Sequence, residues 1–391
     1  MSYKKIYKIK DIGEVVSGTT PSTNNESYWN GNIKWITPAE LIDGHNWYLY
    51  DTNRKITEKA FKDCNLRMLP RGTILLTSRA PIGKVAIVGE EMCTNQGFKS
   101  IICNPNYVNS EYLYFWLLSK KDYLNHLGRG ATFKEISKSI VENIEVPLPS
   151  LEIQNKIVEI LKKALNLIDK RKAQIEALDQ LTQSVFLEMF GDPVTNKTWK
   201  RQLLKDIADV RDGTHDSPKY VPNGYPLVTS KNIKNGKIDL SNVNYISEED
   251  FININKRSKV DVGDIIMPMI GTIGNPIIVN ELPNFAIKNV ALIKFNNPLV
   301  VNIYLKYLLD SHYLDYILNK NKRGGTQKFL SLTDIRNMEI PLPPRDLQNK
   351  FSEIVKKIDS QKSILHKSLR ELEKNFNSLM QRAFKGELLN D

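Results

Sequence analysis

The chain has 391 residues, 41% of them apolar and 25% charged, so each half can bury a core and intrinsic disorder is excluded. A formal net charge of +11 favours a polyanionic partner such as nucleic acid. Three cysteines without a CxxC pair argue against a disulfide frame or zinc knuckle. With no signal-peptide pattern and no membrane-length apolar run, the composition predicts a cytoplasmic protein.

Residues 1–149 have the pattern of a mixed α/β domain. Short runs rich in β-branched residues alternate with turns rich in Gly and Asn. The run at 112–118 is typical of the start of a helix. Strands are expected at 33–36, 74–76, 85–88, 100–103 and 144–146.

A single long helix is predicted over residues 150–190. Pro147-Leu148-Pro149 prevents an earlier start, Ser150 is a suitable N-cap, and Gly191-Asp192-Pro193 ends the helix. Apolar residues at alternating steps of four and three form one stripe, here called the seam. Its members are Ile157, Leu161, Ala164, Ile168, Ile175, Leu178 and Val185. A helix of this length extends for about 60 Å and needs a partner for its seam.

The second half of the chain repeats the first. Pro147 corresponds to Pro341, and Gln154-Asn155-Lys156 to Gln348-Asn349-Lys350, each 194 positions later. Residues 191–343 repeat the turn residues of 1–149, and 344–391 form a second long helix. The seam of the second helix comprises Ile354, Ile358, Leu365, Leu369, Leu372 and Leu379.

The repeat predicts an α+β fold. Two similar mixed α/β domains, at 1–149 and 191–343, are joined by two long helices, at 150–190 and 344–391. We expect the helices to pack as an antiparallel coiled coil, giving a pseudo-twofold internal repeat. The alternative is two separate amphipathic helices, each packed on its own domain.

Catalytic patterns are incomplete throughout the sequence. Residues 78–85 resemble a P-loop but lack its first Gly and the Ser/Thr that holds magnesium. Residues 104–107 approach the Asn-Pro-Pro-Tyr box of adenine methyltransferases, but the third residue differs, and a turn between a strand and a helix explains them better. The five histidines have no metal-ligand spacing. The sequence therefore predicts a non-catalytic chain with no cofactor and no metal.

Loops that recur in both halves carry groups suited to phosphates and base edges. Arg129 to Lys134 and Arg323 to Lys328 place Gly between two cations and a hydroxyl, and amide side chains elsewhere can pair with adenine. The alternative is solvated turns that contact nothing. Tyr28, Trp29 and Trp35 fit a core as well as a stacking surface. The predicted DNA-binding residues are Thr19, Thr20, Ser22, Thr37, Ser78, Arg79, Lys84, Asn95, Gln96, Lys99, Arg129, Thr132, Lys134, Thr214, His215, Ser217, Ser230, Lys231, Asn232, Thr272, Lys288, Asn289, Arg323, Thr326, Gln327 and Lys328.

These features together resemble the specificity subunit of type I restriction–modification systems. The resemblance covers the whole chain and is carried by Ile144 to Pro149 with Glu152 and Gln154, and by Met338 to Pro343 with Gln348. Residues 18–22, 36–38, 78–83 and 95–98 look like recurrent motifs of the family's target-recognition domains. The second half departs from them, because Met269-Ile270 replaces Ser78-Arg79 and Lys288-Asn289 stands near the position of Asn95-Gln96.

The resemblance implies a DNA-binding specificity subunit that reads an asymmetric bipartite target and is not itself an enzyme. It also implies a complex with two methyltransferase subunits and two restriction subunits, acting as an adenine-N6 DNA methyltransferase and an ATP-dependent endonuclease. The helix pair is expected to act as spacer and docking platform, with half-sites about one helical turn apart, roughly 34 Å. The alternatives are a catalytic DNA methyltransferase or nuclease chain, and a protein adaptor that does not bind DNA.

Overall fold

The computed structural model describes residues 5–41, 47–128, 134–234, 236–271, 273–320 and 329–389. The chain forms two compact units: unit 1 comprises 1–172 and 367–391, and unit 2 comprises 173–366. Each long helix contributes one part to each unit. Among the described helices, each is either too short or too polar to cross a bilayer. The predicted domains treat each long helix as a separate part, whereas these units divide each helix in two. The predicted domain limits therefore stay a prediction.

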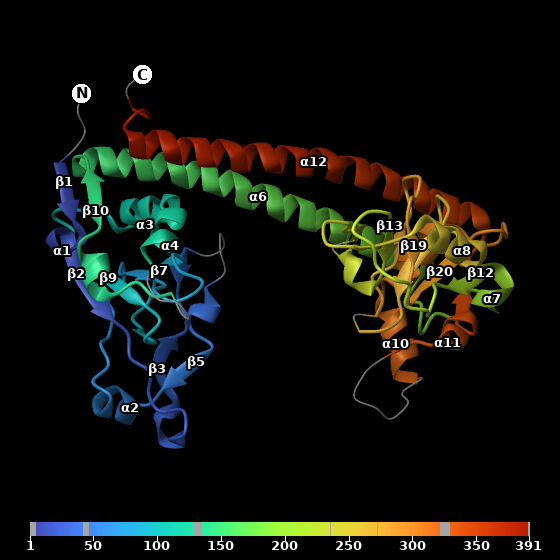
Figure 1. Ribbon diagram of the computed structural model, residues 1–391, viewed down its shortest axis with the longest axis horizontal. Helices are drawn as coiled ribbons and strands as arrows, with labels where there is room; N and C mark the ends of the chain where they lie inside the picture. The colour runs from blue at the N-terminus through green and yellow to red at the C-terminus, as the bar shows by residue number, and fades with distance from the viewer. Residues whose placement is uncertain are drawn as a thin grey trace. The chain divides into compact units, whose positions relative to one another are not determined.

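Unit 1 contains a mixed α/β segment that precedes the first long helix (Figure 1). Its elements are β1 (Lys5–Lys8), α1 (Ile9–Ile12), β2 (Gly13–Ser17), η1 (Glu26–Tyr28), β3 (Trp29–Ile36), η2 (Pro38–Glu40), β4 (Tyr48–Leu49), β5 (Arg54–Ile56), α2 (Glu58–Asp63), β6 (Ile74–Leu76), β7 (Val85–Val88), β8 (Cys93–Thr94), β9 (Lys99–Cys103), α3 (Ser110–Ser119), α4 (Lys121–Leu127), α5 (Lys138–Glu142) and β10 (Glu145–Leu148). The five expected strands and the helix at 112–118 are confirmed, with boundaries shifted by a few residues.

Unit 2 contains a second segment of the same kind. Its elements are β11 (Arg201–Leu203), α7 (Leu204–Ile207), β12 (Asp209–Asp212), β13 (Tyr225–Val228), η3 (Ser230–Asn232), β14 (Ile233–Lys234), β15 (Lys237–Ile238), β16 (Asn244–Ile246), α8 (Glu248–Ser258), β17 (Ile265–Pro268), β18 (Ile277–Ile278), β19 (Ala286–Ile287), β20 (Val290–Lys294), α9 (Asn302–Leu309), α10 (His312–Lys320), α11 (Leu332–Arg336) and β21 (Glu339–Pro341).

The strand order confirms that one fold occurs twice. The main sheet is β2-β9-β6-β7-β4 in unit 1 and β12-β20-β17-β18 in unit 2. Each unit also has a three-stranded sheet, β5-β3-β8 in unit 1 and β16-β13-β19 in unit 2. One pair of strands in each of these sheets is parallel, β3 with β8 and β13 with β19. A two-stranded sheet, β1-β10 or β11-β21, holds the two ends of each segment together. Strand β4 and the β14-β15 hairpin have no counterpart among the described residues of the other unit.

The long helices are α6 (Leu151–Phe190) and α12 (Arg345–Lys385). In unit 1 the first part of α6 packs on the last part of α12, and in unit 2 the last part of α6 packs on the first part of α12 (Figure 1). This exchange means that the two helices run antiparallel. Because each pairing also joins the core of its own α/β segment, the two packing arrangements that the sequence left open occur together.

Burial distinguishes three groups among the predicted seam residues. Ile354 is 36% exposed, so the assignment of Ile354 to the seam is wrong. Phe351, Val355 and Ile358 are buried instead, and their own steps of four and three turn Ile354 away from the partner helix. Ile157, Leu161, Ile168, Ile175 and Ile358 are buried, whereas Ala164, Leu178, Val185, Leu365, Leu369, Leu372 and Leu379 are half-buried.

A fully buried glutamine attaches each long helix to its α/β segment. In unit 1, Gln154 Oε1 accepts a hydrogen bond from Asn109 N at 2.8 Å, and Gln154 Nε2 donates to the carbonyls of Tyr107 and Pro149, both at 3.0 Å. Since a buried amide without partners costs about 1–3 kcal/mol, these bonds fix how the helix starts.

Gln348 makes the same three bonds in unit 2. Its Oε1 accepts from Val301 N at 2.8 Å, and its Nε2 donates to Leu299 O at 3.1 Å and Pro343 O at 2.9 Å. Both glutamines are completely shielded from solvent. The repeated glutamine in the sequence therefore marks a repeated junction.

A tyrosine and a phenylalanine complete each junction. Tyr112 Oη donates to Pro147 O at 3.0 Å, and its ring lies 5.5 Å from that of Phe384 on α12. In unit 2, Tyr304 Oη donates to the Pro341 carbonyl at 2.7 Å, and its ring lies 4.8 Å from that of Phe190 on α6. Each α/β segment is thus held to both long helices within its own unit.

Candidate nucleic-acid interface

In unit 1 the loop that follows β2 lies directly against the turn between β8 and β9. Thr19 N donates to Thr94 O at 2.9 Å. A Cβ atom on Gly18 would lie 1.9 Å from the carbonyl oxygen of Asn95, so only glycine allows this approach. Two predicted contact segments, distant in the sequence, are therefore joined backbone to backbone.

The corresponding loops of unit 2 meet in the same way. Thr214 N donates to Ile287 O at 3.0 Å, and a Cβ on Gly213 would lie 2.4 Å from that oxygen. Lys288 Nζ donates to Ser217 Oγ at 2.7 Å. The structure thus brings Thr214, Ser217 and Lys288, all predicted to bind DNA, onto one surface.

A third loop joins the pair in each unit. Asn95 N donates to the last carbonyl of β3 at 3.0 Å, and Lys288 N donates to the last carbonyl of β13 at 2.9 Å. Thr37 and Thr229 directly follow those strands and begin short 3-10 turns, η2 and η3. Three loops, each predicted separately from the sequence, therefore form one cluster at the ends of the same strands.

The predicted DNA-binding residues differ in solvent exposure. Ser22, Arg79, Gln96, Lys134, His215, Ser217 and Lys231 are exposed, and Thr19, Thr20, Thr37, Lys84, Asn95, Thr214, Ser230, Lys288 and Asn289 are half-buried. Their contact with DNA stays a prediction. Arg129, Thr132, Thr272, Arg323, Thr326, Gln327 and Lys328 lie outside the described residues.

Three predicted DNA contacts are wrong because their polar groups are used inside the protein. Ser78 is buried and its Oγ donates to Gly97 O at 3.1 Å. Asn232 is 5% exposed, and its side-chain amide donates to the carbonyls of Asp239 and Asn242, which follow the β14-β15 hairpin. Lys99 is 8% exposed and forms an ion pair with Glu135 at 3.3 Å. All three support the loops and cannot reach a base edge.

The aromatic residues left open by the sequence belong mainly to the core. Trp35 is 1% exposed and lies 5.2 Å from the half-buried Trp29, ring centre to ring centre. The guanidinium of Arg54 covers Trp29 at 3.9 Å from its ring centroid. A base would have to displace Arg54 before it could stack there.

In unit 2 a polar network surrounds the exposed His215. The ring Nε2 lies 2.6 Å from Asp212 Oδ2 and the ring Nδ1 lies 2.9 Å from Asn289 Oδ1. Asp212 is buried and also pairs with Arg257 at the end of α8. Hydrogen bonds to Asn289 and Asp212 raise the pKa of His215, because the imidazolium form donates from both ring nitrogens.

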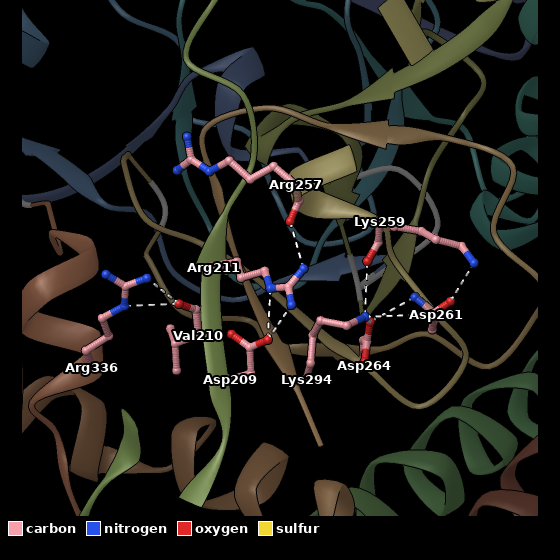
Figure 2. Close-up of polar contacts among 9 residues, drawn as sticks. All are labelled: Asp209, Val210, Arg211, Arg257, Lys259, Asp261, Asp264, Lys294 and Arg336. Atoms are coloured by element: carbon pink, nitrogen blue, oxygen red, sulfur yellow. Dashed lines mark hydrogen bonds and ion pairs between the residues drawn. The ribbon is translucent and has the colours of Figure 1, made fainter. Parts of the chain in front are cut away.

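Figure 2 shows the polar contacts that hold β12, the strand leading into this network. Arg211 pairs with Asp209 at 2.6 Å and donates to the carbonyl of Arg257 at 2.9 Å. Arg336 donates twice to Val210 O, at 3.0 and 2.8 Å. Two side chains therefore tie the strand to its neighbours: Arg211 to the end of α8, and Arg336 to α11.

A second cluster in Figure 2 braces the neighbouring strand β20. Lys294 Nζ lies 2.5 Å from Asp264, 2.9 Å from Asp261 and 3.1 Å from the carbonyl of Lys259. Burial lowers the pKa of Lys294, but the hydrogen bonds to both carboxylates outweigh this effect, so the net shift is upward. The lysine therefore stays charged and links β20 to the residues before β17.

Comparison with known proteins identifies the family. The model of the type I restriction modification DNA specificity domain matches residues 1–178 and again 196–374. The type I restriction enzyme MjaIX specificity subunit of Methanocaldococcus jannaschii is 35% identical over 98% of this chain and 93% of its own length. The chain belongs to the type I restriction–modification DNA specificity family.

Solved structures show the same fold for this specificity chain. A chain from a structural study of assembly and conformational transition in the type I R-M system matches with a TM-score of 0.64 and 18% identity, covering 99% of both chains. The S subunit from M. genitalium gives a TM-score of 0.52 and 16% identity, covering 97% of this chain and 96% of the S subunit.

Sequence reasoning missed two residues of the candidate interface in unit 2, Asp212 and Arg257. Asp212 resembles any charged residue at a strand end, and Arg257 looks like a helix-terminal cation that complements the helix dipole. They lie 45 positions apart and meet only in the folded unit. Among the described residues, no group of three or more His, Cys, Asp or Glu side chains could hold a metal.

We expect the pKa of His215 to lie above the ordinary histidine value. We expect the substitution Asp212→Asn to lower the pKa of His215. The reason is that Asp212 stabilises the charged ring. The charged His215 ring therefore stabilises the folded state. This contribution is fully present below the unfolded-state pKa of the histidine and is lost as the pH rises through the higher folded-state pKa. NMR titration of the His215 ring measures the shift.

Asp216→Asn is the matched control for this titration. It removes a neighbouring exposed carboxylate that, in the described structure, is not a partner of the ring. Equal pKa changes in both variants would contradict the specific pairing with Asp212.

Proposed function

We propose that this specificity chain reads an asymmetric bipartite DNA target, with the loop cluster of each unit contacting one half-site. The observation that carries the proposal is the duplicated three-loop framework bearing different side chains. In unit 1 the loops expose Gln96, with Arg79 exposed beside them, whereas unit 2 presents His215 and Lys231. Amides and guanidiniums can pair with base edges, and lysines bind phosphates.

The chain itself is proposed to be non-catalytic. Its relatives are named as specificity subunits of type I restriction enzymes, so methyl transfer and cleavage would belong to other subunits. We propose association with two methyltransferase subunits and, in the full complex, two restriction subunits, acting in the cytoplasm where the DNA is. An adenine to be methylated must leave the base stack and enter a pocket, which the methyltransferase would supply.

Selection of bound DNA from a random pool, with the methyltransferase partner present, tests this function. We expect two half-sites of different sequence at a fixed separation. Affinity for the selected duplex should fall linearly on a log–log plot as salt rises, because bound lysines and arginines release counterions from the phosphates. Recovery of sequences without a common motif, or affinity independent of salt, would favour a protein adaptor instead.

We further propose that the paired helices set the separation of the half-sites. Inserting equal whole heptads into both α6 and α12 keeps each apolar stripe in phase. Such insertions should lengthen the preferred spacer between the half-sites and leave both half-sites unchanged. The same selection measures both properties.

Inserting a heptad into α6 alone is the control for this experiment, because it breaks the pairing register. Altered half-sites with an unchanged spacer in the double insertion would contradict the role of the helices in spacing.

A further inference from the structure

One position beside the loop cluster is charged in unit 1 and apolar in unit 2. In unit 1, Arg79 follows β6 and forms an antiparallel bridge with Glu135. Arg79 Nε lies 3.0 Å from the carboxylate of Glu135, whose other oxygen is 3.3 Å from Lys99 Nζ. One carboxylate thus pairs with two cations, so the group keeps a net positive charge, and the Arg79 side chain is 48% exposed.

Unit 2 keeps the same backbone arrangement at this position. Leu330 N donates to Met269 O at 2.9 Å, as Ile136 N does to Ser78 O in unit 1 at the same distance. The antiparallel bridge here joins Ile270 to Phe329. The shared hydrogen bond shows that these residues replace Arg79 and Glu135 in space as well as in sequence.

The side chains of the two units differ completely in character. Ile270 is 48% exposed and Phe329 is 49% exposed, and Ala291 replaces Lys99 in the strand register. Single exposed apolar residues are common on protein surfaces. Two large ones bridged together, where the other unit has a salt bridge, form a specific surface, here called the apolar pair.

The apolar pair adjoins the predicted DNA-binding loops of unit 2. Pro268, two residues before Ile270, pairs with Val290 in the sheet. Val290 directly follows Lys288 and Asn289, which lie in the three-loop cluster. The strand pairing therefore places the backbone of the apolar pair near the loop that carries Lys288.

We propose that Ile270 and Phe329 recognise the 5-methyl group of thymine in the half-site contacted by unit 2. This inference rests on the proposed DNA-reading function. Among the base edges of the major groove, the thymine methyl is the apolar group, and aliphatic and aromatic side chains contact it. Lys288 and Lys231 supply charge for the neighbouring phosphates. In unit 1, Arg79 at the same position suits a hydrogen-bonding base edge, so the two units discriminate bases by different chemistry.

Replacement of thymine by deoxyuridine in the selected duplex tests the proposal, because it removes only the 5-methyl group. The half-site of unit 2 is the one whose selected sequence changes in His215→Ala while the other half-site stays the same. With the full chain and its methyltransferase partner, at least one replacement in that half-site should weaken binding about four-fold, as expected for one lost methyl contact. In Ile270→Ala and in Phe329→Ala, the ratio of the affinity for the thymine duplex to the affinity for the uracil duplex should fall to about one. This affinity ratio is called the thymine-to-uracil ratio below.

Two control variants accompany the test. Phe329→Leu keeps an apolar side chain and should retain part of the discrimination. Leu282→Ala removes a side chain that is 90% exposed in the same unit and should leave the ratio unchanged.

Three results would overturn the proposal. The first is sequence-specific binding that is insensitive to uracil throughout this half-site, which would leave the DNA-reading function intact. The second is a half-site without thymine. The third is an unchanged thymine-to-uracil ratio in the alanine variants together with weakened methyltransferase association, which would make the apolar pair a protein-docking surface. Loss of all sequence preference in the unmodified chain would instead contradict the proposed function itself.

Discussion

The buried glutamine at the start of each long helix is the constraint on which the rest of the structure depends. Gln154 and Gln348 each satisfy one backbone N–H and two carbonyls at the point where a β-strand gives way to a helix. Without the glutamine, these backbone groups would lose their hydrogen-bond partner in the protein, and the buried amide would lose its own. The prolines that precede each helix prevent it from starting earlier, so its first turn is fixed relative to the α/β segment. Each unit can therefore vary its loops without loosening the attachment of its helix.

In both units, backbone contacts hold the loops together, while the side chains that the loops expose differ. Gly18 and Gly213 allow close backbone contact between two loops, and this contact needs no particular neighbouring side chain. Side chains at equivalent positions then differ in kind, as the exchange of a salt bridge for the apolar pair shows. The ion pairs on the equivalent strands also differ. Asp212 and Lys294 pair with Arg257 and Asp264 in unit 2, whereas Glu14 and Lys99 pair with Arg67 and Glu135 in unit 1. Such an arrangement suits a chain that recognises two unlike half-sites.

Much of the fold could be predicted from the sequence because it depends on local pattern. The spacing of apolar residues predicted both long helices, and the repeated Pro-Leu-Pro and Gln-Asn-Lys motifs predicted two copies of one domain. The site was predicted less well, because a polar residue in a loop can face inward or outward with the same sequence. Ser78 and Asn232 face inward and bond to the backbone. Asp212 and Arg257 were missed because their pairing arises only when α8 packs beside β12.

Amide hydrogen exchange in single-glutamine variants tests the central claim, that each unit secures its own helix through one buried amide. In Gln154→Ala, exchange of the Asn109 amide should accelerate about tenfold or more, because the amide loses its acceptor, while Val301 stays protected. Gln348→Ala should give the reverse, and Gln361→Ala, an exposed glutamine on α12, should change neither. Equal acceleration in both units from one variant, or no acceleration at either amide, would contradict the claim.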